Sequence, residues 1–155
     1  MKYFICLITV FLFAGCNREA STSYRIEIIN PTMHTIEFRP YYAGIVPPAK
    51  VVRIGGNSIL ETMLDTDRGI TGRAGFISKY FSGADSILVV YDNLYSIIHY
   101  VYTPVALNPK HYLYSSLRNI RNPESYEYTF TDYSKWFRRN NHKYIFTEQD
   151  YLDAK

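Results

Sequence analysis

The feature that most restricts the fold of this chain is a series of short segments in which apolar and polar residues alternate. Residues 24–28 (Tyr-Arg-Ile-Glu-Ile) and 35–39 (Thr-Ile-Glu-Phe-Arg) show this pattern most clearly, and each is followed by turn-forming residues. A period of two is typical of β-strands that bury one face. No segment keeps a helical period over several turns. The sequence therefore predicts an all-β fold, an antiparallel β-sandwich that is immunoglobulin-like in outline.

The aromatic content also favours a β-rich domain. The 155 residues include 16 Tyr, 9 Phe and 1 Trp. Tyrosine suits a half-buried pleated surface, because its ring packs against neighbours while its hydroxyl stays in water.

Turn residues predict how the first strands pair. The two alternating segments flank a turn at residues 30–34, which predicts an antiparallel hairpin. Gly55-Gly56-Asn57 lies between the apolar segments 51–54 and 58–64 and predicts a second hairpin, since tight turns between strands favour glycine and asparagine.

The second half of the chain predicts a central strand and a C-terminal helix. Residues 86–91 are almost entirely apolar, which is typical of a strand buried on both faces. Asp92-Asn93 predicts the turn into a returning strand at residues 96–102. Thr147, followed by Glu148 and Asp150, predicts the start of a short C-terminal helix with an acidic first turn.

The N-terminus predicts an export signal in residues 1–15. A single cation, Lys2, precedes an apolar run at residues 3–14, and polar residues follow Cys16 directly. The length of the run agrees with the ~7–15 residues of a signal-peptide hydrophobic region and is below the ~20 residues of a membrane-spanning helix.

The signal ends in Phe13-Ala14-Gly15-Cys16, which resembles the bacterial lipobox. In that pattern a large apolar residue and two small residues precede the cysteine that receives lipid, and Phe13 stands where leucine is usual. The resemblance implies that Cys16 carries fatty-acyl chains such as palmitate. These chains would attach the protein to the outer membrane, at its periplasmic face or at the cell surface. Residues 16–23 are then the lipidated cysteine with a polar tether, and residues 24–155 a single β-sandwich domain.

Cysteine usage and charge narrow the chemistry further. Cys6 leaves with the signal and Cys16 takes up lipid, so the domain is expected to have no disulfide, cysteine-bound metal or cysteine nucleophile. Removal of Lys2 lowers the formal net charge from +3 to +2. Such a balanced charge argues against a nucleic-acid partner. No cofactor and no metal site is expected.

Two internal segments add a family resemblance. These segments are residues 84–93 (Ala-Asp-Ser-Ile-Leu-Val-Val-Tyr-Asp-Asn) and residues 144–151 (Tyr-Ile-Phe-Thr-Glu-Gln-Asp-Tyr). Together with the lipobox, they resemble the small uncharacterised lipoproteins of Bacteroidota. The resemblance implies an envelope location and a β fold, and it carries over no catalytic residue.

The segment around Trp136 is the main candidate for a contact surface. Arg138, Arg139 and Lys143 follow Trp136, and the Asn-Asn pair at 140–141 predicts a tight turn among them. An aromatic, basic hairpin of this kind can contact anionic lipid headgroups, an acidic glycan or an envelope protein. The alternative is an ordinary charged hairpin tip whose Trp136 packs in the core.

Other sequence patterns give weaker support for a calcium, phosphate-binding or catalytic site. Residues 65–69 begin like a calcium loop but lack the third ligand and the closing glutamate, and the glycine-rich segment after them lacks the Lys-Ser/Thr of a phosphate loop. A serine triad could combine His99 and Asp92 with Ser86 or Ser96, but no nucleophile elbow supports it.

The predicted function is a non-catalytic binding or structural module of the cell envelope. Two alternatives stay open, a glycan-binding or adhesion lipoprotein that uses exposed aromatic rings and a small envelope hydrolase. The candidate platforms for sugar stacking are Tyr41, Tyr42, Tyr91, Tyr95, Tyr100, Tyr102, Tyr112, Tyr114, Tyr126 and Tyr128.

Overall fold

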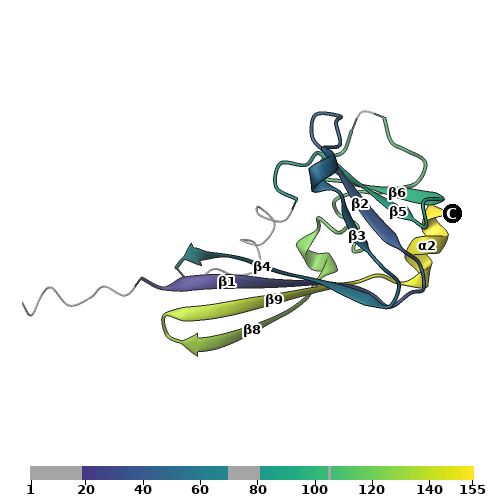
Figure 1. Ribbon diagram of the computed structural model, residues 1–155. Helices are drawn as coiled ribbons and strands as arrows, with labels where there is room; N and C mark the ends of the chain where they lie inside the picture. Colours follow the sequence, from purple (N-terminus) through teal and green to yellow (C-terminus); the bar gives the residue numbers. More distant parts are fainter. Residues whose placement is uncertain (1–18, 70–80, 105) are drawn as a thin grey trace, which may run out of the picture.

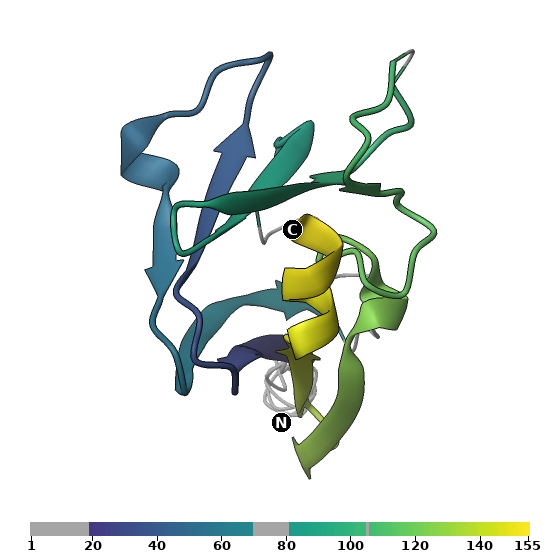
Figure 2. The same cartoon turned by 90° about the vertical axis from the view of Figure 1, so that its right-hand side faces the viewer.

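The structure is a computed structural model that describes residues 19–69, 81–104 and 106–155 (Figures 1 and 2). The export signal, Cys6 and Cys16 lie outside the described residues, as does the glycine-rich segment at 70–80. Within the described residues the chain forms two β-sheets and one short C-terminal helix, so the predicted all-β sandwich is confirmed.

Four strands form the first sheet, called sheet A. They are β1 (Ser21–Asn30), β4 (Ser58–Arg68), β8 (Glu127–Ser134) and β9 (Phe137–Ile145), in the order β4-β1-β9-β8. The strand β1 pairs antiparallel with β4 and parallel with β9.

Five strands form sheet B. They are β2 (Ile36–Tyr41), β3 (Val52–Ile54), β5 (Ser86–Tyr91), β6 (Tyr95–Tyr100) and β7 (His111–Tyr112), in the order β3-β2-β5-β6-β7. The strands β6 and β7 are parallel, and the other pairs of this sheet are antiparallel. Each sheet therefore contains one parallel pair beside its antiparallel pairs, and the immunoglobulin-like outline is not confirmed.

The hydrophobic core lies between the two sheets. Every second residue of β1 faces inward, as the alternation in its sequence predicts, whereas β5 is buried along most of its length. Each fully buried isoleucine or phenylalanine stabilises the fold by about 1.5–3 kcal/mol. Side chains that are 1% exposed or less include Tyr24, Ile26, Ile28, Ile36, Phe38, Ile87, Val89, Tyr91, Tyr144 and Phe146.

The predicted central strand is confirmed, together with its turn. The strand β5 lies in the middle of sheet B and pairs with β2 on one side and β6 on the other. Asp92 and Asn93 both have positive φ, at 52° and 58°. That conformation belongs to the tight turn that joins twisted antiparallel strands.

Both hairpins predicted in the first half of the chain are wrong. The strands β1 and β2 lie in different sheets, and so do β3 and β4. Residues 31–35 and 55–57 are therefore connections between sheets rather than turns within a sheet.

Asn30 explains why the chain crosses between the sheets at these points. Its buried side chain donates from Nδ2 to the carbonyls of His34, at 2.7 Å, and Gly55, at 2.8 Å. The two connections thus pack against each other. A Cβ atom on Gly56 would lie 2.6 Å from the carbonyl oxygen of Met33, so this position requires glycine for close backbone approach.

The helix α2 (Glu148–Ala154) covers one end of the sandwich, and its predicted start at Thr147 is confirmed (Figure 2). Thr147 donates to Oδ2 of Asp150 from its backbone N–H, at 2.7 Å, and from its hydroxyl, at 2.9 Å. Arg118 donates to the same carboxylate from Nε, at 2.7 Å, and from Nη2. These contacts fasten the helix to the loop before η3 (Pro123–Ser125).

Candidate binding surfaces

The hairpin of β8 and β9 contains the contact residues predicted from the sequence, but it turns at a different place. The turn is formed by Lys135 and Trp136. Asn140 lies in the middle of β9, fully buried, where its Oδ1 accepts a hydrogen bond from the hydroxyl of Tyr128 at 3.1 Å. The predicted Asn140-Asn141 turn is therefore wrong, because tertiary packing places this pair inside a strand.

Strand alternation separates the four predicted residues. Arg139 and Lys143 point to the outer face of sheet A, whereas Arg138 lies on the same face as the buried Asn140. Trp136 is 39% exposed at the turn, so it is not packed in the core. The structure brings together only two of the four residues in one hollow.

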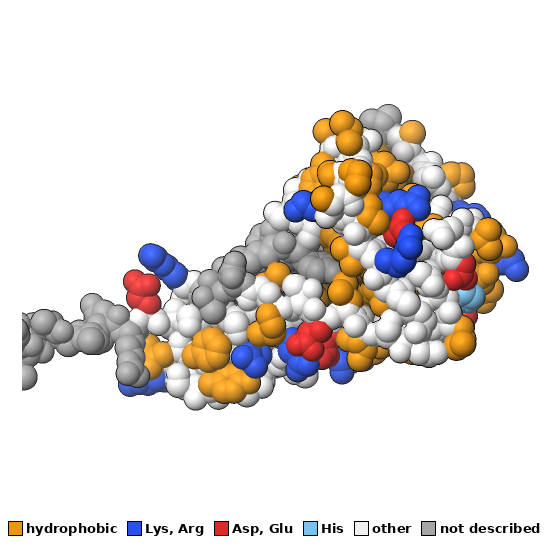
Figure 3. Space-filling view, viewed as in Figure 1, with side chains coloured by type: hydrophobic (Ala, Val, Ile, Leu, Met, Phe, Trp, Pro, Cys, Tyr) orange, Lys and Arg blue, Asp and Glu red, His pale blue; other side chains and the backbone are white. Residues whose placement is uncertain are grey.

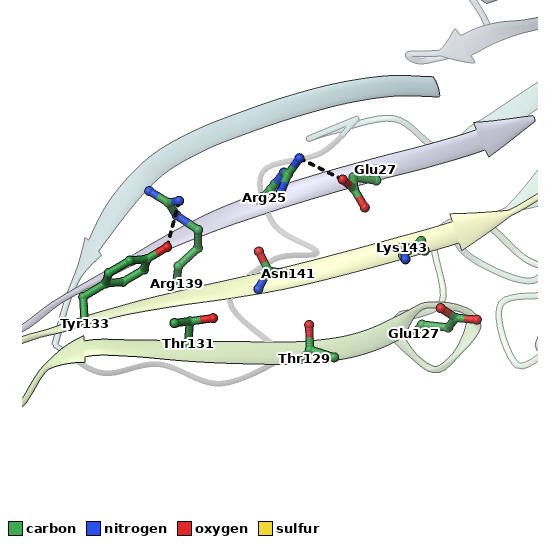
Figure 4. A pocket seen from close by; sticks show the side chains of 9 residues that line it. All are labelled: Arg25, Glu27, Glu127, Thr129, Thr131, Tyr133, Arg139, Asn141 and Lys143. Carbon is green, nitrogen blue, oxygen red and sulfur yellow. Dashed lines mark hydrogen bonds and ion pairs between the residues drawn. The ribbon is translucent and has the colours of Figure 1, made fainter. Parts of the chain in front are cut away.

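A shallow groove of about 340 Å³ runs along the outer face of sheet A (Figure 4). Strand pairing places the lining residues side by side: Thr131 lies opposite Arg139, and Asn141 lies between Thr129 and Arg25. The residues that line it are Arg25, Glu27, Glu127, Thr129, Thr131, Tyr133, Arg139, Asn141 and Lys143.

Arg25 is already held by neighbouring carboxylates in this groove. Its Nη2 lies 2.8 Å from Glu61 and 3.0 Å from Glu27. The hydrogen bond from Arg25 keeps the pKa of the Glu61 carboxyl below its usual value. Arg25 is thus committed to the sheet itself, and a ligand would have to compete for it.

Arg139 is a second guanidinium of the groove, and its described contacts are with a tyrosine. Its Nη1 donates to the hydroxyl of Tyr133 at 3.1 Å, and its guanidinium lies 5.1 Å from the centre of the Tyr133 ring. Its buried Nε finds no hydrogen-bond partner among the described residues. A guanidinium among threonine hydroxyls and an asparagine amide suits a carboxylated or hydroxyl-rich ligand.

A second hollow, the tyrosine pocket, lies on the outer face of sheet B. Pairing places Ser86 of β5 between Tyr41 of β2 and Tyr100 of β6. Tyr102 and Asp85 complete most of this pocket of about 320 Å³, whose other lining residues are Gly44 and Pro104. Three tyrosines with a carboxylate and a hydroxyl form an aromatic platform that has polar groups at its side.

The sequence named these three tyrosines among ten candidates but could not choose them. The choice depends on the order β2-β5-β6, which places Tyr41 and Tyr100 on either side of one strand. Local contacts shape the rim as well. Asp85 accepts a hydrogen bond from the backbone N–H of Ala43 at 2.6 Å, and the hydroxyl of Tyr100 accepts one from Asn108 at 3.1 Å.

The serine triad considered from the sequence is not assembled. His99 is fully buried on the inner face of sheet B, where its Nδ1 accepts a hydrogen bond from the backbone N–H of Ile120 at 3.0 Å. Ser86 and Ser96 occupy alternate positions that face outward. Asp92 instead contacts a different histidine, His34.

His34 joins the sheet connection to the C-terminal helix. Its Nδ1 lies 2.6 Å from Asp92 and its Nε2 lies 3.3 Å from Glu148, while its ring stacks on Tyr151 at 3.6 Å. Hydrogen bonds from the Thr35 N–H and from His34 lower the pKa of Asp92. Because both ring nitrogens face carboxylates, this cluster serves to connect the loop at His34 to the C-terminal helix.

In the three described ranges, no group of three or more His, Cys, Asp or Glu side chains could hold a metal ion. No helix in these ranges is long and apolar enough to cross a bilayer. Residues 65–68, the start of the segment that resembles a calcium loop, belong to β4.

The chain was compared with protein-family models, with curated proteins and with solved structures. No match was found. Function must therefore be argued from the residues and their geometry.

Proposed function

We propose that this protein is a lipid-anchored protein of the cell envelope, whose β-sandwich is a non-catalytic binding module. The proposal combines the apolar run, the lipobox and Cys16 with the position of the folded domain. The observation that carries it is that β1 begins at Ser21, only five residues after Cys16. Five extended residues span at most about 18 Å. A lipid on Cys16 would hold this end of sheet A next to the bilayer.

The cysteine usage of the chain agrees with the proposed anchor. The only two cysteines, Cys6 and Cys16, precede the described residues. The sandwich thus folds around its aromatic and aliphatic core and needs no disulfide in an oxidising compartment. The contacts of His99 and Asp92 support a role without catalysis, because each is engaged in packing or in binding another side chain.

The experiment that tests the anchor is substitution of its cysteine. Cys16→Ala should abolish incorporation of labelled fatty acid and release the protein from the membrane fraction of the native host. Wild-type protein expressed at the same level is the control. Retention of both the label and the membrane partition in the variant would overturn the proposal.

The tyrosine pocket favours glycan binding as the second candidate function. Sugar rings stack on exposed aromatic faces, and a nearby carboxylate can accept hydrogen bonds from their hydroxyls. Tyr102 is 74% exposed at the edge of this pocket, whereas Tyr114 is 37% exposed and does not line it. Tyr102→Ala should reduce binding to immobilised envelope polysaccharide, and Tyr114→Ala should leave it unchanged. Equal binding by the wild type and both variants would contradict this candidate.

A further inference from the structure

The start of β1 and the turn of the β8–β9 hairpin lie at the same end of sheet A (Figure 1). The parallel pairing of β1 with β9 places Ser21 opposite Phe137. The backbone N–H of Ser21 donates to the carbonyl of Trp136 at 2.8 Å. Any lipid on Cys16 is therefore limited to about 18 Å from the hairpin turn by the length of the chain between them.

The start of β1 is held firmly on its other side as well. The N–H of Gly69 donates to the carbonyl of Ala20 at 2.5 Å, and the hydroxyl of Thr22 donates to the carbonyl of Gly69 at 2.9 Å. The point at which the tether enters the domain is thus fixed relative to the hairpin. The helix α2 and the C-terminus lie at the opposite end of the molecule (Figure 1).

The residues 132–139, called the hairpin tip, combine aromatic rings with positive charge. Trp136 is 39% exposed and Tyr133 is 57% exposed. Each ring has a cation beside it, since the Nζ of Lys135 lies 5.0 Å from the Trp136 ring and Arg139 lies 5.1 Å from the Tyr133 ring. In the space-filling view, hydrophobic side chains (orange) lie over this end of sheet A (Figure 3).

The charge of the hairpin tip is clearly positive. The hairpin tip contains three cations, Lys135, Arg138 and Arg139, and one carboxylate, Asp132, which gives a formal charge of +2. Asp132 accepts two hydrogen bonds from Arg138, at 2.7 and 3.1 Å, so that these two charges neutralise each other. Lys135 and Arg139 have no carboxylate partner in the described part of the chain.

We propose that the hairpin tip is a second membrane contact, in which Trp136 enters the headgroup layer of an anionic bilayer beside the lipid on Cys16. This inference rests on the proposed lipid anchor and adds to it a defined orientation. Tryptophan and tyrosine favour the interface between bilayer and water, and neighbouring cations are attracted by anionic lipids. Because the lipid anchor already supplies the free energy of membrane binding, contacts of the hairpin tip need only determine which side of the domain faces the bilayer.

Trp136 itself provides the test, because it is the only tryptophan of the chain. The mature lipoprotein, which begins at the lipidated Cys16, would be placed in vesicles of phosphatidylcholine and phosphatidylglycerol whose acyl chains carry bromine, which quenches tryptophan at close range. We expect strong quenching of Trp136 and a blue shift of its emission relative to the protein in detergent. The charge reversal Lys135→Glu, in an exposed turn, should weaken the quenching in these vesicles.

A matched control moves the reporter to the far end of the molecule. In the double variant Trp136→Phe/Leu152→Trp the single tryptophan lies on α2, where Leu152 is 56% exposed. Its emission should stay unquenched in the same vesicles. Equal quenching at both positions would mean adsorption without orientation and would overturn the inference.

The outcomes separate this inference from the proposed anchor. Protein that carries fatty acid and floats with the vesicles, but whose Trp136 is unquenched, would overturn the membrane contact and leave the proposed function intact. Protein that carries no fatty acid would overturn both.

Discussion

The contact between Arg118 and Asp150 offers the sharpest test of how the domain is held together. The side chain of Asp150 is 1% exposed and accepts hydrogen bonds from Arg118 and Thr147. Truncation to alanine removes all of these acceptors at once. We therefore predict that Asp150→Ala strongly destabilises the domain.

The magnitude follows from the exposure of the two partners. Removing one member of a buried ion pair costs about 3–5 kcal/mol. Arg118 keeps 35% of its side chain exposed, so water partly replaces its lost partner and the lower value applies. Loss of the contacts with Thr147 at the start of α2 adds about 1 kcal/mol. The expected loss of about 4 kcal/mol is a large share of the ~5–15 kcal/mol by which domains are stable.

The assay is urea unfolding at neutral pH, followed by far-ultraviolet circular dichroism. With a dependence of ~1–3 kcal/mol per molar urea, the midpoint should fall by about 2 M at an unchanged slope. Asp153→Ala is the matched control, because it removes the same charge from an exposed position of the same helix, where the side chain accepts hydrogen bonds from Tyr112 and Gln149, and it should cost about 1 kcal/mol. Equal midpoints for the two variants would refute the reasoning.

Three further predictions concern other parts of the fold. Gly56→Ala should lower the melting temperature, because its Cβ would meet the carbonyl of Met33 at 2.6 Å. Gly55→Ala is the control and should leave the melting temperature unchanged, since its Cβ would lie 3.6 Å from its nearest neighbour. Similar melting temperatures for the two variants would contradict this prediction. Burial lowers the pKa of His99 to about 3. Only the unfolded chain then takes up this proton below pH ~6.5, so stability should fall as the pH drops from there toward 3. A nuclear magnetic resonance titration of the His99 ring that gave a pKa near 6.5 would contradict this. Reducing agent should leave the melting temperature of the processed protein unchanged, and a large decrease would reveal a bridge between chains.

The parts of the fold that could be predicted depend on local chemistry. The alternation in β1, the apolar run of β5, the Asp92-Asn93 turn and the Thr147 cap each act within a few residues. Pairing between strands depends on contacts between distant residues. Asn30 reaches the carbonyl of Gly55, 25 positions along the chain, and a sequence that offers Gly-Gly-Asn gives no sign of such a partner.

The candidate surfaces could be predicted only in part for the same reason, since they depend on contacts between distant residues. Arg138, Arg139 and Lys143 are close in sequence, but which of them share a face depends on where the hairpin turns. Burial of Asn140 against Tyr128 moves that turn to Lys135 and Trp136. The position of Trp136 beside Ser21 could not be predicted either, because it follows from a parallel pairing of two strands at opposite ends of the chain.

The central claim is that lipid on Cys16 holds this sandwich at a membrane, and the mass of the mature protein tests it most directly. Protein purified from the membranes of its native host should begin at Cys16 and be heavier than residues 16–155 by the mass of a diacylglycerol group or more. A chain that keeps residues 1–15, or one whose Cys16 carries no fatty acid, would contradict the account.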